Sequence, residues 1–339
     1  MKFPLSRMYR VGWGSLVVVV RAVAVVVGLV VVVGGCGGGG GGGSSSSGSG
    51  LEKSSLSVGM LPVGDVAQLQ VAIDRGFFRA EGLSVKTQVL QGGAEAVPKL
   101  RSKNLDISFG AWVPFFMAQA SGAITLHAVA PAFDSAPGTH VVLVPKDSPI
   151  RSARDLAGKK IGINVKHNLG SLLMQATLQP QGVRLDDNAN FVAMPFPNMQ
   201  AALQSRSVDA VQAVEPFNTQ IQKAIGARQV VELSAGPTAN FPIAGYVSTE
   251  DFAKDNPKTL AAFQRAIGKA QALLTDKAVL AKTIPEYTKI PPAAAATLHY
   301  GTYPTTLDPA ALKRVSDLMV KYGYIKSPID VNTLVTNKG

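Results

Sequence analysis

The sequence predicts an α/β fold of two lobes, each a mostly parallel sheet flanked by helices. Two observations carry this prediction. From Leu56 onward, short apolar segments typical of strands alternate with segments whose apolar residues recur at helical spacing. The same alternation begins again near Ile161. Alternating strands and helices favour parallel sheets, and the repeated block favours two lobes.

The elements of the first block follow from its apolar spacing. Strands are expected at 56–60, 85–89, 106–109, 125–130 and 141–144. Helices are expected at 66–73 and 94–101, and a third begins near Pro114, because proline is favoured in the first turn of a helix. These elements are enough to build one sheet with helices on its faces.

The second block repeats this order and leads into a helical tail. Its strands are expected at 161–164, 191–193, 210–214 and 229–232, and its helices at 171–178, at 198–204 and from Pro216. A strand at 244–248 precedes two helices, at 260–274 and 312–322, whose apolar residues step by three and four. Asp308 and Pro309 provide a cap and a first-turn proline for the last of these helices.

The tail has no sheet of its own, so we expect it to return to the first lobe. The first lobe would then be discontinuous, formed by 55–142 and 243–339, with the second lobe at 143–242. The chain would cross between the lobes near 142–145 and 237–245.

The first 35 residues have the order of a secretory signal. Four basic residues and no acidic ones accompany an apolar run at 22–33, which ends in two glycines. Twelve apolar residues are too few to span a bilayer as a helix. We therefore treat 1–35 as a signal peptide and exclude it from the fold.

Cys36 is the only cysteine and follows directly on Val33-Gly34-Gly35. This string resembles the bacterial lipoprotein box, in which the cysteine is acylated and becomes the new N-terminus. A buried core thiol is the alternative, but the neighbours of Cys36 are polyglycine. The Gly/Ser stretch at 36–54 is expected to be a flexible tether. The expected location is the cell envelope, lipid-anchored to the outer face of the cytoplasmic membrane.

Composition argues against several other classes of protein. The formal net charge is +11, and four of these positive charges lie in the leader, which leaves about +7. The Lys and Arg residues are scattered and not interleaved with aromatics, so nucleic-acid binding is disfavoured. The four histidines lie far apart, and no nucleophile elbow or phosphate loop is present. We expect no metal, no cofactor and no catalysis.

Three strings resemble one family, the binding proteins for nitrate, alkanesulfonates, taurine and thiamine pyrimidine precursors. They are AIDRGFFRAEGL at 72–83, DLAGKKIG at 155–162, and SVDAV at 207–211 running on to Glu215-Pro216. The sequence departs from the family at Lys103-Asn104, where Gly-Glu is usual, and at Ser207, where glycine is usual. Both are turn positions, so the departures affect the turns more than the assignment.

The resemblance implies a periplasmic-binding-protein fold, with two lobes that close on a ligand about a two-stranded hinge. It implies an extracytoplasmic solute-binding lipoprotein that captures a small organic molecule or anion for an ABC importer. The implied partners are the small-molecule ligand and the ABC permease subunits with their cytoplasmic ATPase, and the protein is expected to be a monomer.

Ligands of open α/β sheets bind beyond the carboxyl ends of the strands, which selects the candidate site residues. The nine candidates are Asp65, Gln91, Gly92, Gly93, Trp112, Asn168, Gly170, Ser171 and Glu215. The bare amides of the Gln91 to Gly93 segment and the helix start at Asn168 to Ser171 suit a polar or anionic group. Trp112 suits a stacking wall, and Glu215 suits a ligand amine.

Each candidate also has a purely structural interpretation. The glycine segment can be only a turn, and the segment at Asn168 only a helix cap. Trp112 can belong to the core, and Glu215 can serve the dipole of the helix that follows it. Two further residues, Lys166 and His167, indicate an anion, whereas Trp112 and Glu215 indicate a flat, amine-bearing ring such as a pyrimidine. The ligand therefore stays open.

Two other functions remain on the same fold. One is an enzyme, similar to the thiamine-pyrimidine synthase or to a dehydratase of menaquinone biosynthesis. The synthase resembles this family but carries a cysteine-rich motif and acts inside cells, whereas Cys36 is the only cysteine here and follows an export signal. The other is a ligand sensor without a transport role.

Overall fold

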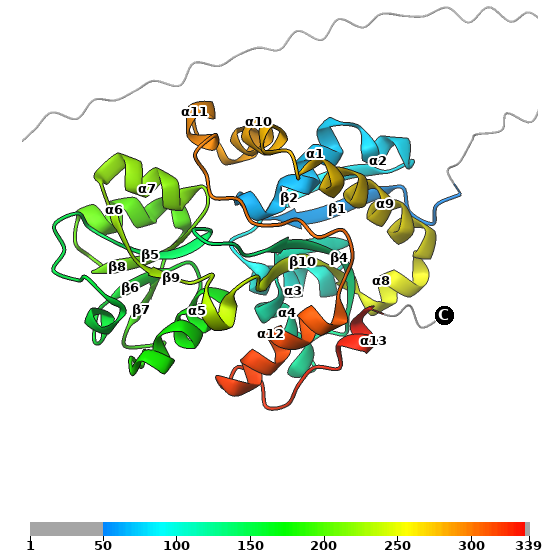
Figure 1. Ribbon diagram of the computed structural model, residues 1–339. Coiled ribbons are helices and arrows are strands. Elements are labelled where there is room, and N and C mark those ends of the chain that lie inside the picture. The colour runs from blue at the N-terminus through cyan, green and yellow to red at the C-terminus, as the bar shows by residue number, and fades with distance from the viewer. Residues whose placement is uncertain (1–49, 336–339) are drawn as a thin grey trace, which may run out of the picture. The chain divides into compact units, whose positions relative to one another are not determined.

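The computed structural model describes residues 50–335, which form two five-stranded sheets flanked by helices (Figure 1). The first sheet consists of β1 (Ser55–Met60), β2 (Ser84–Val89), β3 (Ile107–Ala111), β4 (Leu126–Asp134) and β10 (Pro242–Thr249). The second sheet consists of β5 (His140–Val144), β6 (Ile161–Ile163), β7 (Phe191–Ala193), β8 (Ala210–Val214) and β9 (Arg228–Glu232). The expected α/β class with two lobes is confirmed.

Both sheets have the same topology. The strand order is β2-β1-β3-β10-β4 in the first and β7-β6-β8-β5-β9 in the second. In each, the three strands at one side pair in parallel, and the fourth position holds an antiparallel strand, β10 or β5. Each antiparallel strand is the first one that the chain forms after it crosses between the lobes. Each sheet is therefore mostly parallel, as the sequence predicted.

The chain leaves the first sheet after Asp134 and enters the second at His140. The expected boundary between residues 142 and 143 falls inside β5, and all of β5 pairs with β8 or β9. The crossing thus precedes the strand, because strand pattern alone does not tell which sheet a strand joins. The return crossing lies between Glu232 and Pro242.

Helices cover both sheets. Those of the first lobe are α1 (Ala67–Asp74), α2 (Phe77–Ala80), α3 (Gly93–Arg101) and α4 (Trp112–Ala120). Those of the second lobe are α5 (Leu169–Leu178), α6 (Met199–Gln204) and α7 (Phe217–Ile225). The tail contains α8 (Glu250–Asp255), α9 (Pro257–Leu273), α10 (Lys277–Thr288), α11 (Pro292–Ala295), α12 (Pro309–Lys321) and α13 (Val331–Val335).

The tail packs mainly on the first lobe. Helix α9 lies against α1 and α2, where Phe263 stacks on Phe78 with ring centroids 5.2 Å apart, and α12 packs against α4 (Figure 1). Helix α12 begins after Asp308, whose side chain accepts the amide of Ala310 at 2.8 Å, so the expected cap is present. The tail also contacts the second lobe, because α12 touches α5.

The folded part of the chain begins before the expected end of the tether at residue 54. The carboxylate of Glu52 accepts the backbone amides of Lys258 and Thr259 in the first turn of α9. The side chain of Lys53 forms an ion pair with Asp106 at 2.7 Å. The segment predicted to be a signal peptide at 1–35, Cys36 and the predicted tether up to residue 49 lie outside the described residues. No helix within residues 50–335 has the length and apolarity needed to cross a membrane.

Candidate functional site: a cavity shared by the two lobes

A cavity of about 50 Å³ lies where the carboxyl ends of the parallel strands in the two sheets face each other. In both lobes this is the switch point of the sheet: β1 lies between β2 and β3, and β6 lies between β7 and β8. The cavity is lined by residues of both lobes, which are Leu61, Val63, Asp65, Gly92, Gly93, Phe109, Ala111, His140, Asn164, Asn168, Leu169, Gly170, Phe196, Gln212, Val214, Ile243 and Ala244.

The first lobe contributes one ionisable side chain, Asp65, on the segment that follows β1. Two tail tyrosines hold this segment by its backbone carbonyls: the Tyr287 hydroxyl donates to Val63 O at 3.0 Å and the Tyr303 hydroxyl donates to Gly64 O at 2.8 Å. From the second lobe, Glu215 O accepts the amide of Gly64 at 3.0 Å. Asp65 is therefore fixed in place by contacts to its backbone neighbours on two sides.

Asp65 is 7% exposed, and among the described residues its carboxyl group forms no ion pair and no hydrogen bond with another residue. Burial raises its pKa from 3.8 to about 7, against a smaller opposing effect of its own backbone amide. None of the residues that line the cavity is Lys or Arg. The backbone amide of Asp65 is the one hydrogen-bond donor that its carboxyl group has among the described residues, so acceptor capacity remains for a further group.

The second lobe contributes four polar side chains that carry no charge at neutral pH, those of His140, Asn164, Asn168 and Gln212. Burial lowers the pKa of His140 to about 4, so its imidazole is neutral there, and its Nδ1 lies 3.2 Å from the hydroxyl of Thr139. The Oδ1 atom of Asn168 is buried without a hydrogen-bond partner. These groups can donate to or accept from a polar ligand.

Two helices begin at the cavity, one from each lobe. Gly92 and Gly93 precede and open α3, whereas Asn168 and Gly170 flank the start of α5. Side chains at these glycines would meet neighbours: a Cβ on Gly93 would lie 2.8 Å from Pro114, and one on Gly170 would lie 2.6 Å from Gln212 Oε1. Unpaired amides at a helix N-terminus favour electronegative groups, and here two such termini converge.

A wider groove adjoins this cavity. It has a volume of about 460 Å³ and shares Phe196 with the cavity, and Phe196 stacks on Phe217 with ring centroids 5.6 Å apart. Both rings belong to the second lobe, whereas Tyr287 and Val89 line the groove from the first. A ligand longer than the cavity therefore has space to extend between the lobes.

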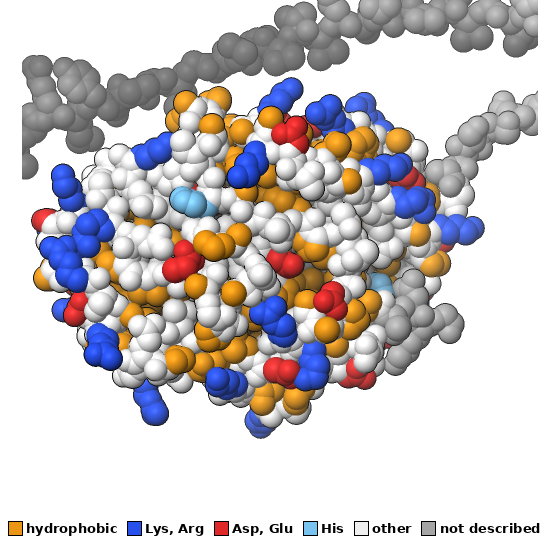
Figure 2. Space-filling view, in the orientation of Figure 1, with side chains coloured by type: hydrophobic (Ala, Val, Ile, Leu, Met, Phe, Trp, Pro, Cys, Tyr) orange, Lys and Arg blue, Asp and Glu red, His pale blue; other side chains and the backbone are white. Residues whose placement is uncertain are grey.

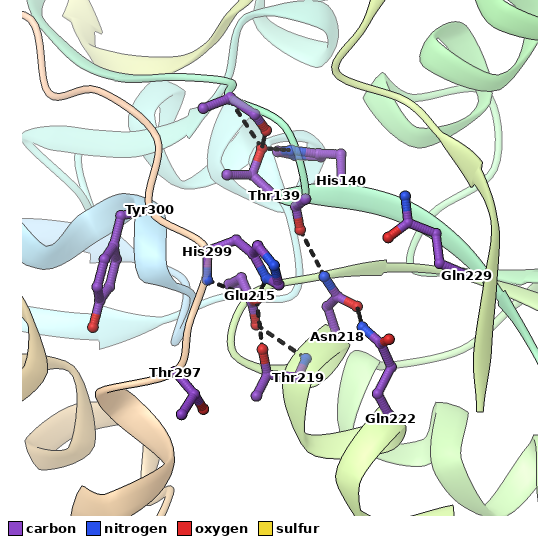
Figure 3. A network of polar contacts seen from close by, with 12 residues as sticks. Thr139, His140, Glu215, Asn218, Thr219, Gln222, Gln229, Thr297, His299 and Tyr300 are labelled. Carbon is purple, nitrogen blue, oxygen red and sulfur yellow. Dashed lines mark hydrogen bonds and ion pairs between the residues drawn. The ribbon is translucent and has the colours of Figure 1, made fainter. Parts of the chain in front are cut away.

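Glu215 lies in a polar network beside the cavity (Figure 3). Its carboxylate accepts the hydroxyl of Thr219 at 2.7 Å and the amide of Thr219 at 3.1 Å. From the tail, the amide of His299 donates to it at 3.0 Å, and His299 Nδ1 lies 2.9 Å away. The side chain of Asn218 in the same network donates to Gly138 O at 2.6 Å. The carboxylate is fully engaged within the protein, so it is unsuited to accept a ligand amine.

The nine candidate residues divide into two groups. Five of them line the cavity together, which are Asp65, Gly92, Gly93, Asn168 and Gly170. The other four do not line it, which are Gln91, Trp112, Ser171 and Glu215. Gln91 is exposed and its amide donates to Glu95 at 2.9 Å. The hydroxyl of Ser171 is buried, where it accepts the amide of Asn168 and the hydroxyl of Tyr324.

Trp112 corrects the expectation of a stacking wall. The indole is 1% exposed and packs in the core of the first lobe, beside Phe116 and over Gly245. A Cβ on Gly245 would lie only 2.0 Å from the indole, so the glycine is required for this packing. The cavity wall at this place is formed instead by Ala111 and Ala244.

Lys166 and His167, which indicated an anion, line a separate groove of about 480 Å³ beside α3 and α4. His167 Nδ1 lies 2.9 Å from Asp187, and its ring stacks on Tyr324 at 4.2 Å. Neither residue lines the cavity itself. Within residues 50–335, no three His, Cys, Asp or Glu side chains gather closely enough to hold a metal ion.

The sequence argument missed His140 and Gln212. His140 begins the antiparallel strand β5, so the amino end of that strand lies at the carboxyl edge of its parallel neighbours. Gln212 lies inside β8 and is 1% exposed. The sequence signal that could have identified it was an amide side chain among apolar strand residues. Its side chain reaches the cavity because Gly170 leaves room for it.

The paired sheets and the cavity between them define the two-lobed periplasmic-binding-protein fold. Solved structures share this fold, among them the alkanesulfonate-binding protein SsuA of Xanthomonas axonopodis pv. citri bound to MOPS, with a TM-score of 0.71, 20% identity, and coverage of 84% of this chain and 98% of that one. The nitrate-binding protein NrtA of Synechocystis gives 0.69 at 14% identity, covering 84% and 85%. The desulfurization enzyme DSZB gives 0.63 at 19% identity, covering 84% and 97%.

Residues 49–285 match the NMT1-like family, and the chain belongs to this family. A Brucella abortus protein named as a binding protein is 25% identical over 280 residues, which are 77% of this chain and 83% of that protein. An Escherichia coli protein named as an aliphatic sulfonates-binding protein is 26% identical over 251 residues, 70% of this chain and 75% of that protein. The suspected resemblance to nitrate- and sulfonate-binding proteins is thereby confirmed.

One relative is much longer than this chain. The nitrate import ATP-binding protein NrtC of Synechocystis is 27% identical over 186 residues, which are 51% of this chain but only 28% of that protein. The match therefore concerns one part of that protein.

Proposed function

We propose that the protein captures a small solute in the cavity between its lobes and delivers it to an ABC importer. The single observation that carries this proposal is the composition of the cavity wall, because polar groups from both lobes face the same space. A solute bound there touches both lobes at once, so its binding favours the closed arrangement. The names of the relatives, which include sulfonate-binding and nitrate-binding proteins, support the same role.

The proposal extends to the partners and the location of the protein. We infer that it acts outside the cytoplasm, with permease subunits and a cytoplasmic ATPase as partners, and that Cys36 carries the lipid anchor. The basic and apolar leader before Cys36 and the glycine-rich segment after it support the anchor. On the face shown in Figure 2, Lys and Arg side chains are scattered among other types and form no single patch.

Co-purification tests the capture of a solute. Native mass spectrometry of the full chain, purified without dialysis, should show a small molecule that leaves on mild denaturation. Asn168→Ala removes a polar group of the cavity and should reduce its occupancy, whereas Asn188→Ala at an exposed turn is the control. A protein that carries no solute, and that is not thermally stabilised by sulfonates, nitrate, amino acids or pyrimidines, would contradict the proposal.

Fractionation tests the anchor. Cys36→Ser should move the protein from the membrane fraction to the soluble fraction, because the acylated thiol is lost. Retention of the Cys36→Ser protein in the membrane would show that another segment holds it there.

An enzyme is the second candidate, because the fold neighbour DSZB is named as a desulfurization enzyme. We propose binding without turnover. After prolonged incubation with excess protein, the bound solute should be recovered with its mass unchanged. Any product formed in excess over the protein would favour the enzyme.

A further inference from the structure

One segment of the tail contacts both lobes beside the two places where the chain crosses between them. It comprises residues 297–303, between α11 and α12, and we call it the strap. The chain itself crosses between Asp134 and His140 and again between Glu232 and Pro242. The strap therefore adds a third connection between the lobes, and this one depends on hydrogen bonds and packing that can break.

The end of the strap is fixed to the first lobe. Thr302 forms two backbone hydrogen bonds with Asp134 at the end of β4, with N–O distances of 2.9 and 3.0 Å. The ring of Tyr303 packs edge-on against Phe133, with ring centroids 5.3 Å apart. A Cβ on Gly301 would lie 2.3 Å from Asp134 O, so this close approach of two backbones requires glycine. The end of the strap should therefore move with the first lobe.

The start of the strap is bound to the second lobe instead (Figure 3). Lys223 Nζ, on α7, donates to Thr297 Oγ1 at 2.5 Å. The Glu215 carboxylate accepts the amide of His299 at 3.0 Å, and His299 Nδ1 lies 2.9 Å from the same oxygen. Thr297 is exposed and the His299 side chain is 49% exposed. Water can therefore replace the second lobe at both residues when the lobes separate.

Glu215 holds the first lobe at a second point. Its backbone carbonyl accepts the amide of Gly64 at 3.0 Å, on the segment that carries the cavity residue Asp65. Its carboxylate is tied to its own lobe through the amide and the hydroxyl of Thr219. Val214, directly before Glu215, lines the cavity. One residue of the second lobe thus binds both the strap and the cavity segment of the first lobe.

The strap also covers the first crossing between the lobes. A Cβ on Gly138 would lie 2.4 Å from Cδ2 of His299, so the imidazole rests directly on the backbone of the crossing. Gly138 has a φ of 85°, in the left-handed region that favours glycine. A rotation of the lobes about this crossing must move Gly138 past His299. Such a rotation strains or breaks the bonds between His299 and Glu215.

We propose that the strap is a latch that holds the two lobes in the closed arrangement, with Glu215 as its positioning residue on the second lobe. When the lobes separate, the strap stays with the first lobe, and its bonds from Thr297 and His299 to the second lobe break. The latch stabilises the closed arrangement without touching a solute, so it acts whatever the solute is. This inference goes beyond the proposed function, because it concerns the unloaded protein.

Amide hydrogen exchange, resolved by residue with NMR on the dialysed full chain, tests the latch without any solute. The reporter is the amide of Gly64, because its bond to Glu215 O joins the lobes and involves no strap side chain. In His299→Ala this amide should exchange about tenfold faster, since losing a bond to a carboxylate favours the open arrangement. The amide of Thr302, bonded to Asp134 within the first lobe, should exchange as in the wild type.

Thr297→Val tests the other bond of the strap against a matched control. It removes the hydroxyl that accepts Lys223 Nζ and donates to Ala294 O. Thr275→Val also removes a hydroxyl that donates to the carbonyl three residues before it, but among the described residues that hydroxyl has no bond to the second lobe. Thr297→Val should speed the exchange of Gly64 by about two- to tenfold, and Thr275→Val should leave it unchanged.

Three results would overturn the latch. A Gly64 amide that is unprotected in the wild type would show that the unloaded lobes are not held together. Unchanged exchange of Gly64 in both His299→Ala and Thr297→Val would limit the strap bonds to a local role. Equal acceleration of Gly64 and Thr302 would indicate general destabilisation instead of separation of the lobes.

The latch and the proposed function fail separately. If a solute co-purifies and Gly64 does not respond to the strap variants, the function stands and the latch is wrong. If Gly64 responds as expected and no solute co-purifies or stabilises the protein, the latch stands and the function is wrong.

Discussion

The two lobes repeat one topology and fill it with different chemistry. Strands β1 and β3 of the first sheet and β6 and β8 of the second end at the cavity, and in both sheets an antiparallel strand occupies the fourth position. The first lobe contributes a carboxyl group at Asp65, whereas the second contributes the neutral side chains of His140, Asn164, Asn168 and Gln212. The repeated sheet therefore sets where the site lies, and the side chains placed there set what it binds.

Equivalent positions in the two lobes also differ in structural role. Strands β3 and β8, which occupy the same position in their sheets, lead to Trp112 and Glu215. Trp112 packs into the core of its lobe, whereas Glu215 ties Thr219 to the tail residue His299. The first lobe is thus stabilised at this point by apolar packing, and the second by a polar network that also holds the tail.

The largest expected effect concerns Trp112. Trp112→Ala should lower the free energy of unfolding by about 3–5 kcal/mol, because a fully buried indole leaves a cavity above Gly245. Urea denaturation measures this loss, and Trp112→Phe should cost clearly less. Solute affinity of the folded protein should change little. A stable Trp112→Ala protein with much weaker binding would instead place the indole at the site.

Asp65 should make the first lobe less stable as the pH rises. Its pKa is raised from 3.8 to about 7, so between these values the folded state holds a proton that the unfolded state has lost. The contribution of Asp65 to the free energy of unfolding is fully present below pH 3.8. It is lost as the pH rises to about 7, and the loss is on the order of 4 kcal/mol. Without solute, Asp65→Asn should therefore be more stable than the wild type at pH 8 and nearly equal to it at pH 4. An equal difference at both pH values would contradict the raised pKa.

His140 should act in the opposite direction in the second lobe. Its pKa is lowered from 6.5 to about 4, so between these values the unfolded state binds a proton that the folded state does not. The contribution of His140 to the free energy of unfolding is fully present above pH 6.5. It decreases by roughly 3 kcal/mol as the pH falls to about 4. Relative to the wild type, His140→Gln should therefore gain stability as the pH is lowered from 7 to 4. Melting curves of the two proteins across this range measure the difference.

The fold was predictable because apolar spacing reports burial directly. The strands and helices expected from Leu56 to the last long helix are present, including the cap at Asp308. Spacing does not report strand direction, so the start of β5 with His140 was not recognised as a neighbour of the carboxyl ends. It also does not tell which way a residue after a strand turns, and Trp112 turns toward the core while Ala111 faces the cavity. Five cavity residues on the segments after parallel strands were therefore found, whereas Asn164, which follows β6, and the strand residues His140 and Gln212 were missed.

Replacing a glycine by alanine should affect solute binding differently at the starts of α3 and α5. In the second lobe, Gly170→Ala would place a Cβ 2.6 Å from Gln212 Oε1, so the Gln212 amide, which lines the cavity, must shift. We expect about tenfold weaker solute binding, or about 1.4 kcal/mol, with little change in stability. In the first lobe, Gly92→Ala meets only Val165 at 3.4 Å and should bind nearly as the wild type does. Equal losses in both variants would show that the helix amides, and not Gln212, are disturbed.

The smallest expected effect is at a contact that joins the lobes. The Tyr324 hydroxyl, from the tail beyond α12, donates to Ser171 Oγ in the second lobe at 2.8 Å, and the Tyr324 ring stacks on His167. Tyr324→Phe keeps the ring and removes the hydroxyl, so one buried hydrogen bond of the closed arrangement is lost, worth about 0.5–1.5 kcal/mol. We infer that this bond is broken when the lobes separate, so the loss should appear as solute affinity lower by about two- to tenfold, through faster release rather than slower capture. Stopped-flow measurements separate the two rates.

Tyr322→Phe, on the same segment and without a hydrogen bond to the second lobe in the described residues, is the matched control. Slower capture with unchanged release in Tyr324→Phe would mean that the hydroxyl shapes the open state instead.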